Sequence, residues 1–261
     1  MADIPVALTI AGSDPSGGAG IQADLKTFHQ FGVYGEAVIT LITVQNTVGV
    51  ERVEVLAPDL VVQQIQAVVR DIPPAAAKTG ALGNRGVIEG VAELASKFPF
   101  PLITDPVILS KHGAPLMSSD AVDALKQLLL PHVFLLTPNL PEAAALTGRE
   151  VHDLAGMRAA ASALHDLGAQ SVLVKGGHLR GKATDILLYR GEWSEFESPR
   201  IETRHTHGTG CTYSAAITAG LARGLTLPVA VRKAKRYIHA AIKTNPGLGA
   251  GAGPVNHSVS P

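Results

Sequence analysis

The sequence predicts an α/β protein whose central sheet is mostly parallel and is covered by helices on both faces. Short apolar runs typical of strands alternate with segments in which apolar residues recur every three or four positions, as in amphipathic helices. Polar and glycine-rich residues follow most of the strand-like runs, at the carboxyl ends of the strands. The edge formed by these strand ends is where open α/β sheets bind ligands. The 261 residues can bury a sizeable core, so residues 1–261 are expected to form one domain.

A strand, a loop and a helix open the chain. Residues 6–11 are almost entirely apolar, residues 12–20 are rich in glycine, and residues 20–31 place Ile21 and Leu25 on one helical face. This order is the beginning of a β-α-β unit, which implies parallel strands.

The same alternation continues toward the C-terminus. Further strands are expected over residues 37–44, 75–79, 102–104, 133–136 and 171–174. Helices are expected after Pro58, over residues 84–97, 119–130 and 155–167, and from Cys211 to about Gly224. Two β-like runs within residues 185–199 predict a hairpin. The glycine-rich residues 246–254 are expected to be either a mobile end or a loop that closes over a ligand.

Composition excludes several classes of protein. A hydrophobic content of 46% with 17% charged residues is unlike a disordered chain, and a formal net charge of zero provides no field to attract nucleic acid. The apolar runs are too short to span a bilayer. A single cysteine forms no internal disulfide and the N-terminus lacks a signal-peptide pattern, so a cytoplasmic protein is expected. A homodimer remains open.

Two glycine-rich segments resemble nucleotide-binding loops, and both interpretations are rejected. Residues 176–183 approach the P-loop pattern, but Ala183 replaces the hydroxyl residue that holds magnesium, and strand-like residues follow. Residues 18–23 resemble a dinucleotide fingerprint, but the strand ending near Gln45 offers no acidic residue for a ribose. The histidines show no ligand-like spacing, so no zinc site is expected.

The segment 206–211 is the strongest candidate for chemistry. Its glycines precede a run of small apolar residues, which predicts a glycine-rich helix N-terminus. Free backbone N–H groups and the helix dipole make such a terminus suitable for a phosphate or a developing anion. Cys211 lies on this turn, where the dipole is expected to lower its pKa and make it a base. The alternative is a plain turn before a core helix, with Cys211 packed as a small apolar residue.

Polar side chains at three other strand ends could complete a phosphoryl-transfer site. Asn139 and Glu142 are one helical turn apart and suit magnesium, although the same pair could cap a helix. Asp105 is a second metal candidate, and Lys175, beside two glycines, suits a phosphate. Gln45 ends another strand, and its amide could read a heteroaromatic edge or simply bond within a turn. Together these groups supply metal ligands, charge neutralisation and an anion site.

The sequence resembles the hydroxymethylpyrimidine/phosphomethylpyrimidine kinases of thiamine biosynthesis, a family of the ribokinase-like superfamily. The resemblance extends from about residue 6 to residue 257 and rests on GSDPSGGAGIQADLKT at 12–27, QNT at 45–47, DPV at 105–107, TPN at 137–139, KGGH at 175–178 and THGTGC at 206–211. It implies a ribokinase-like three-layer α/β/α sandwich. It also implies an ATP- and Mg²⁺-dependent kinase that phosphorylates 4-amino-5-hydroxymethyl-2-methylpyrimidine and then its monophosphate.

The resemblance also implies roles for individual residues. It places Gly208, Gly210 and Cys211 at the anion site, with Cys211 as the base where sugar kinases carry aspartate. It implies that Gln45 holds the pyrimidine in a pocket lined by Gly12 and Asp24.

Contacts with ATP are implied for Lys175, Thr209, Asp185 and Lys235, and magnesium ligation for Asn139, Glu142 and Asp105.

Two positions depart from the family pattern, and two alternatives stay open. His112 stands in Lys111-His112-Gly113 where Lys-Ser-Gly is more usual, and His205 stands where asparagine commonly precedes Thr-His-Gly. Pyridoxal kinases share the Gly-Thr-Gly-Cys segment, so a pyridoxal/pyridoxine kinase is the first alternative. A non-catalytic metabolite sensor on the same fold is the second.

Overall fold

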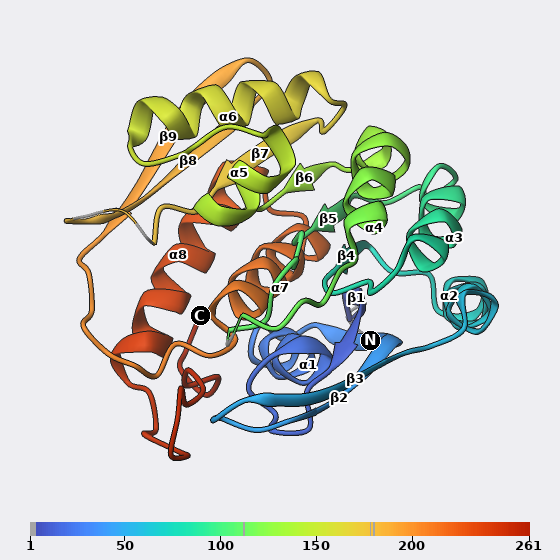
Figure 1. The fold of residues 1–261 in the computed structure, drawn as a ribbon, viewed down its shortest axis with the longest axis horizontal. Coiled ribbons are helices and arrows are strands. Elements are labelled where there is room, and N and C mark those ends of the chain that lie inside the picture. The colour runs from blue at the N-terminus through green and yellow to red at the C-terminus, as the bar shows by residue number, and fades with distance from the viewer. Residues whose placement is uncertain (1–3, 112, 178, 180) are drawn as a thin grey trace.

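The computed structural model describes residues 4–111, 113–177, 179 and 181–261. The departure at His112 and the end of the KGGH motif at His178 lie outside the described residues. Figure 1 shows a sheet running through the middle of the molecule with helices on either side. The described residues form a nine-stranded sheet in the order β3-β2-β1-β4-β5-β6-β7-β8-β9. The expected α/β/α sandwich with a mostly parallel central sheet is therefore confirmed.

The middle of the sheet is parallel and its two edges are antiparallel. Strands β2, β1, β4, β5, β6 and β7 run parallel, whereas β3 and the β8–β9 hairpin are antiparallel to their neighbours. The strands are β1 (Val6–Ser13), β2 (Tyr34–Gln45), β3 (Val50–Val55), β4 (Ala76–Thr79), β5 (Leu102–Thr104), β6 (Leu135–Leu136), β7 (Ser171–Val174), β8 (Ala183–Tyr189) and β9 (Glu192–Ser198).

The helices divide between two cores, one on each face of the sheet. Alternate strand residues face opposite sides, so Leu8 packs into one core and Ala7 into the other. The first core is covered by α2 (Pro58–Asp71), α3 (Arg85–Ala95), α4 (Ser119–Ala124), α5 (Leu140–Thr147) and α6 (Leu154–Asp166). The second is covered by α1 (Gly20–Gln30), α7 (Thr209–Ala222) and α8 (Leu227–Lys243).

Three elements differ from the sequence-based expectations. Strand β3 was missed, because its residues alternate between exposed and half-buried at the sheet edge and carry little apolar signal. Helix α8 was missed after Gly224, because Pro228 suggested a stop, whereas proline in a first turn starts this helix. The helix expected over residues 119–130 remains α-helical only to Ala124 and continues as a π-turn and a 3₁₀ turn.

The glycine-rich tail packs against two loops of the protein. The backbone N–H of Ala252 donates to the carbonyl of Thr47, and the N–H of His207 donates to the carbonyl of Gly253. These bonds join the β2–β3 turn and the segment before α7 to the same stretch of chain. No helix among the described residues is long and apolar enough to cross a bilayer.

Candidate active site

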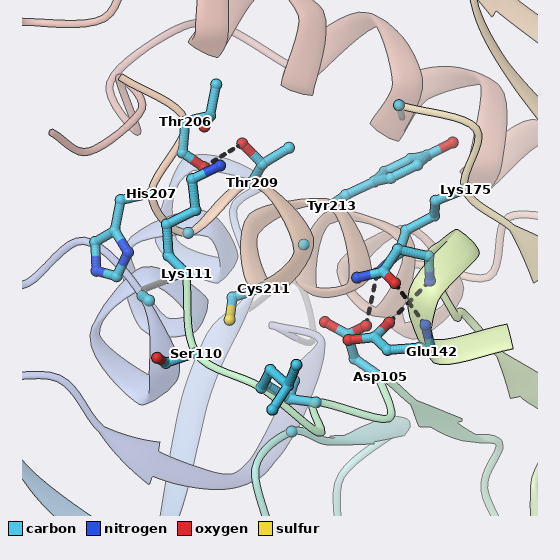
Figure 2. Close-up of a pocket in the computed structure, with 18 of the residues that line it drawn as sticks. Asp105, Ser110, Lys111, Glu142, Lys175, Thr206, His207, Thr209, Cys211 and Tyr213 are labelled. Atoms are coloured by element: carbon cyan, nitrogen blue, oxygen red, sulfur yellow. Dashed lines mark hydrogen bonds and ion pairs between the residues drawn. The ribbon is translucent and has the colours of Figure 1, made fainter. Parts of the chain in front are cut away.

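A cavity of about 750 Å³ opens at the carboxyl edge of the sheet. Its walls come from the ends of β1, β2, β5, β6 and β7 and from the first turn of α7. The fold therefore brings together residues that are far apart in the sequence. Figure 2 shows several of these side chains converging on the cavity. Among the predicted site residues, those that line it are Gly12, Gln45, Asp105, Asn139, Glu142, Lys175, Asp185, Gly208, Thr209, Gly210, Cys211 and Lys235.

The first turn of α7 forms one wall, as predicted. Gly208 caps the helix at φ +76°, and a side chain there would collide with the carbonyl of Gly18. A Cβ on Gly210 would lie 3.3 Å from Asp105 Oδ2, so glycine lets the polar strand ends approach the helix. Thr209 closes the turn by donating its hydroxyl hydrogen to the carbonyl of Thr206 at 2.7 Å. The turn presents backbone donors that lack intrahelical partners.

Cys211 lies at the floor of the cavity, but its thiol differs from the prediction. Figure 2 shows the sulfur pointing into the space between α7 and the loop that carries Ser110. Burial raises the pKa of Cys211 to about 12, and the carboxylates of Asp24 and Asp105 add to this against the opposing charge of Lys78. The expectation that the helix dipole lowers this pKa is therefore wrong for the free protein. Desolvation of a thiolate outweighs the half-charge of the helix terminus.

Lys175 and Asp105 form an ion pair beside the α7 turn. Lys175 Nζ lies 2.7 Å from Asp105 Oδ1, and Asp105 also accepts a hydrogen bond from Thr137. Burial alone would lower the pKa of Lys175, but the charges of Asp105 and Glu142 raise it. The lysine is therefore a permanent cation in the cavity wall, which suits the phosphate contact predicted for it.

Asn139 and Glu142 cap helix α5 and also line the cavity. The Asn139 side chain accepts from the Glu142 N–H, and Glu142 Oε2 accepts from the Asn139 N–H, both at 2.8 Å. The capping alternative is thus realised, and the metal role stays a prediction. Burial raises the pKa of Glu142 to about 7, because Lys175 offsets the desolvation only in part and Asp105 adds a like charge.

The carboxylates of Glu142 and Asp105 fit a hard divalent cation. Both are oxygen donors that line one cavity, and the raised pKa of Glu142 shows that its negative charge is under-compensated there. A cation at this wall would favour the ionised form.

Asp185 and Lys235 contact each other at the far end of the cavity. Lys235 Nζ lies 2.7 Å from Asp185 Oδ2, which also accepts from the hydroxyl of Tyr213 at 2.9 Å. Asp185 Oδ1 accepts from the backbone N–H of Gly176 at 3.0 Å. The pair therefore joins β8, α7 and α8 to the glycine-rich loop after Lys175. Their predicted role in ATP binding remains a prediction.

Asp24 does not line the cavity, which corrects its predicted placement. Its side chain is fully buried and pairs with Lys78 at 2.8 Å, while the Thr9 hydroxyl donates to it at 2.6 Å. Asp24 lies on the face of helix α1 that packs against the sheet, where it meets the equally buried Lys78 of β4. This ion pair holds the carboxylate inside the protein. The sequence did not predict a role for Lys78, because a lysine in a short strand has no local pattern that indicates burial or an ion pair.

Three cavity groups were missed by sequence analysis. His207 Nε2 lies 2.7 Å from Asp14 Oδ2, and both side chains are buried behind Gln45. Lys111 extends along the cavity toward the turn of Thr206, as Figure 2 shows. Asp14 and His207 belong to recognised motifs, but nothing in their local sequence indicated that the two loops meet.

Comparisons with known proteins agree with this geometry. A family model described as phosphomethylpyrimidine kinase matches residues 14–256. A Haemophilus influenzae protein named hydroxymethylpyrimidine/phosphomethylpyrimidine kinase is 47% identical, and the match covers 98% of each chain. An ADP complex of Bacillus subtilis pyridoxal kinase superimposes with a TM-score of 0.90 at 40% identity, covering 98% of each chain. A Clostridium difficile phosphomethylpyrimidine kinase has a TM-score of 0.81 at 43% identity, covering 91% of this chain and 99% of that one.

The match to the family model, the nearly full-length relative and the shared fold lead to one conclusion. This chain belongs to the phosphomethylpyrimidine kinase family.

Proposed function

We propose that this protein is a kinase that uses ATP and Mg²⁺ to phosphorylate 4-amino-5-hydroxymethyl-2-methylpyrimidine and then its monophosphate. The product of the second step is the diphosphate used in thiamine diphosphate biosynthesis. The names of the H. influenzae and C. difficile relatives support this acceptor, and the ADP complex of the B. subtilis structure supports ATP as the donor.

One observation carries the proposal. A single cavity brings together an anion-binding helix turn, the charged Lys175, a pair of carboxylates and the amide of Gln45. Phosphoryl transfer needs positioning and neutralisation of charge more than covalent chemistry by the protein, and these groups supply both.

In this mechanism each group in the cavity has a separate role. Backbone donors of the α7 turn and the ammonium of Lys175 hold the transferring phosphate, and Gln45 orients the acceptor ring. Glu142 and Asp105 would hold Mg²⁺, which when bound neutralises charge on the ATP phosphates. Cys211 faces the acceptor hydroxyl as the candidate base.

Product analysis tests the proposal. The purified protein, Mg²⁺-ATP and the pyrimidine alcohol should yield first a monophosphate and then a diphosphate by ³¹P NMR. The matched reaction without the alcohol measures background hydrolysis. A protein that binds the alcohol without consuming ATP would instead be a sensor, and the proposal would fail.

Pyridoxal is a second candidate acceptor, since the B. subtilis pyridoxal kinase shares the fold at 40% identity. Parallel assays with pyridoxal and pyridoxine measure this activity. The proposal expects a larger kcat/KM for the pyrimidine alcohol than for either pyridine.

Removing the amide of Gln45 should weaken acceptor binding selectively. Gln45 lies at the end of β2 in the cavity wall, and a lost hydrogen bond in such a site costs on the order of 1 to 3 kcal/mol. Gln45→Ala should therefore raise KM for the pyrimidine and leave KM for ATP nearly unchanged. Steady-state kinetics with each substrate varied in turn provide the measurement, and an unchanged pyrimidine KM would contradict the role.

Glu142→Gln should lower kcat and weaken the dependence on Mg²⁺ while preserving the fold. Glutamine at this position keeps the acceptor that completes the capping box of α5, so the free energy of unfolding should change by less than about 1 kcal/mol. The variant loses only the charge. A kcat titrated against Mg²⁺ checks this, and a wild-type titration curve would exclude Glu142 as a metal ligand.

A further inference from the structure

Three polar side chains from separate segments of the chain meet in the wall of the cavity. His207 Nε2 lies 2.7 Å from Asp14 Oδ2 and 3.3 Å from Gln45 Nε2. All three line the cavity, but Asp14 is only 3% exposed and His207 only 4% exposed. The mechanism above uses Gln45 and assigns nothing to the other two residues.

The carboxylate of Asp14 is ionised and fixed in place. The backbone N–H groups of Ser16 and Ala19 donate to it, each at 2.8 Å. Burial alone would raise the pKa of Asp14, but the hydrogen bonds from His207 and Ser16 outweigh burial and lower it to about 2. A carboxylate only accepts hydrogen bonds, so the imidazole nitrogen 2.7 Å away must carry a hydrogen.

The imidazole is also held by its backbone. The N–H of His207 donates to the carbonyl of Gly253, and its own carbonyl accepts from Val255. A side chain on Gly18 would collide with the ring, so the glycine loop closes around it. The Nε2 atom that lies beside Gln45, and that donates its one hydrogen to Asp14, is therefore fixed in position.

A ring nitrogen that carries a hydrogen cannot accept one from the NH₂ group of Gln45. The two ends of a carboxamide have nearly the same shape, so the neighbouring groups determine which end faces which way. We propose that Asp14 and His207 are positioning residues that hold the Gln45 oxygen toward the imidazole and its NH₂ group toward the acceptor. The site then selects acceptors that present a ring nitrogen, a hydrogen-bond acceptor, at that point.

This inference deepens the proposed function and rests on it. An aminopyrimidine has two ring nitrogens, so replacing each by C–H in turn gives two analogues of nearly the same shape. Calorimetric Kd values and kcat/KM are measured for the parent and both analogues. The wild-type protein should lose about 10- to 100-fold in affinity for one analogue, because that analogue leaves the Gln45 donor unpaired.

His207→Phe should reduce this discrimination to a few-fold, as should Gln45→Met. The double variant His207→Phe/Gln45→Met should keep the same affinity ratio between the two analogues as Gln45→Met alone. His207 acts through Gln45, so the two effects do not add. His207→Gln retains an N–H donor and should restore most of the discrimination. His205→Phe is the matched control, since His205 bonds the tail at Gly253 and does not contact Gln45.

The Kd for ATP and the melting temperature of each variant separate positioning from loss of fold. Wild-type discrimination in folded His207→Phe, or additive effects in the double variant, would overturn the inference alone. Failure of the wild-type protein to bind the parent pyrimidine would overturn the proposed function and this inference with it.

Discussion

Cys211→Ala is expected to slow phosphorylation of the hydroxymethyl group about 10²-fold and to leave phosphorylation of the monophosphate within a few-fold of wild type. The alcohol must lose a proton as the new bond forms, whereas the monophosphate already presents an ionised oxygen and needs no base. Steady-state assays of both acceptors with this variant provide the measurement. If both phosphorylations slowed by the same factor, Cys211 would not be the base and would serve only as part of the anion site.

The raised pKa of Cys211 gives this prediction a pH dependence. With a pKa of about 12, the thiol is protonated at neutral pH and the thiolate fraction grows with each unit of rising pH. If the thiolate is the base, kcat for the alcohol should rise about tenfold per pH unit between neutrality and pH ~9. The second phosphorylation should lack this rise, and so should Cys211→Ala. A flat wild-type profile for the alcohol would contradict the base role.

Lys175→Met should lower kcat by about 10²- to 10³-fold, because it removes the cation that we propose holds the transferring phosphate. It should also destabilise the protein by on the order of 3 to 5 kcal/mol, since it strands the buried carboxylate of Asp105 without its partner. Urea unfolding and steady-state kinetics measure the two effects.

A second substitution separates those effects. Lys175→Met combined with Asp105→Asn removes the stranded charge, so stability should recover. The kcat should stay low, because this double variant lacks both the Lys175 cation and a proposed Mg²⁺ ligand. Lys182→Met is the matched control, because Lys182 forms only an exposed pair with Glu197. Recovery of kcat in the double variant would show that Lys175 has a structural role alone.

Local patterns predicted the parallel part of the fold. The apolar runs that became β1, β4, β5 and β7 are buried on both faces, so their composition was enough to identify them. The half-exposed β3 lacks that signal, because its stability comes from pairing with β2 rather than from its own residues.

Sequence order predicted site residues where a strand ends or a helix begins. Lys175, Glu142 and Cys211 occupy such positions, and the structure places all three in the wall of one cavity. Contacts between segments far apart in the sequence left no such signal, and these include the Asp24–Lys78 and Asp14–His207 pairs. The pKa of Cys211 also depends on burial by several segments, which no local pattern reports.

A crystal structure of the protein with the pyrimidine alcohol and a non-hydrolysable ATP analogue would show whether this cavity is the catalytic site. The pyrimidine ring should lie against Gln45, its hydroxymethyl oxygen within hydrogen-bond reach of Cys211 Sγ, and the terminal phosphate on the α7 turn beside Lys175. A pyrimidine bound outside this cavity, or a terminal phosphate away from the Gly208–Cys211 turn, would contradict it.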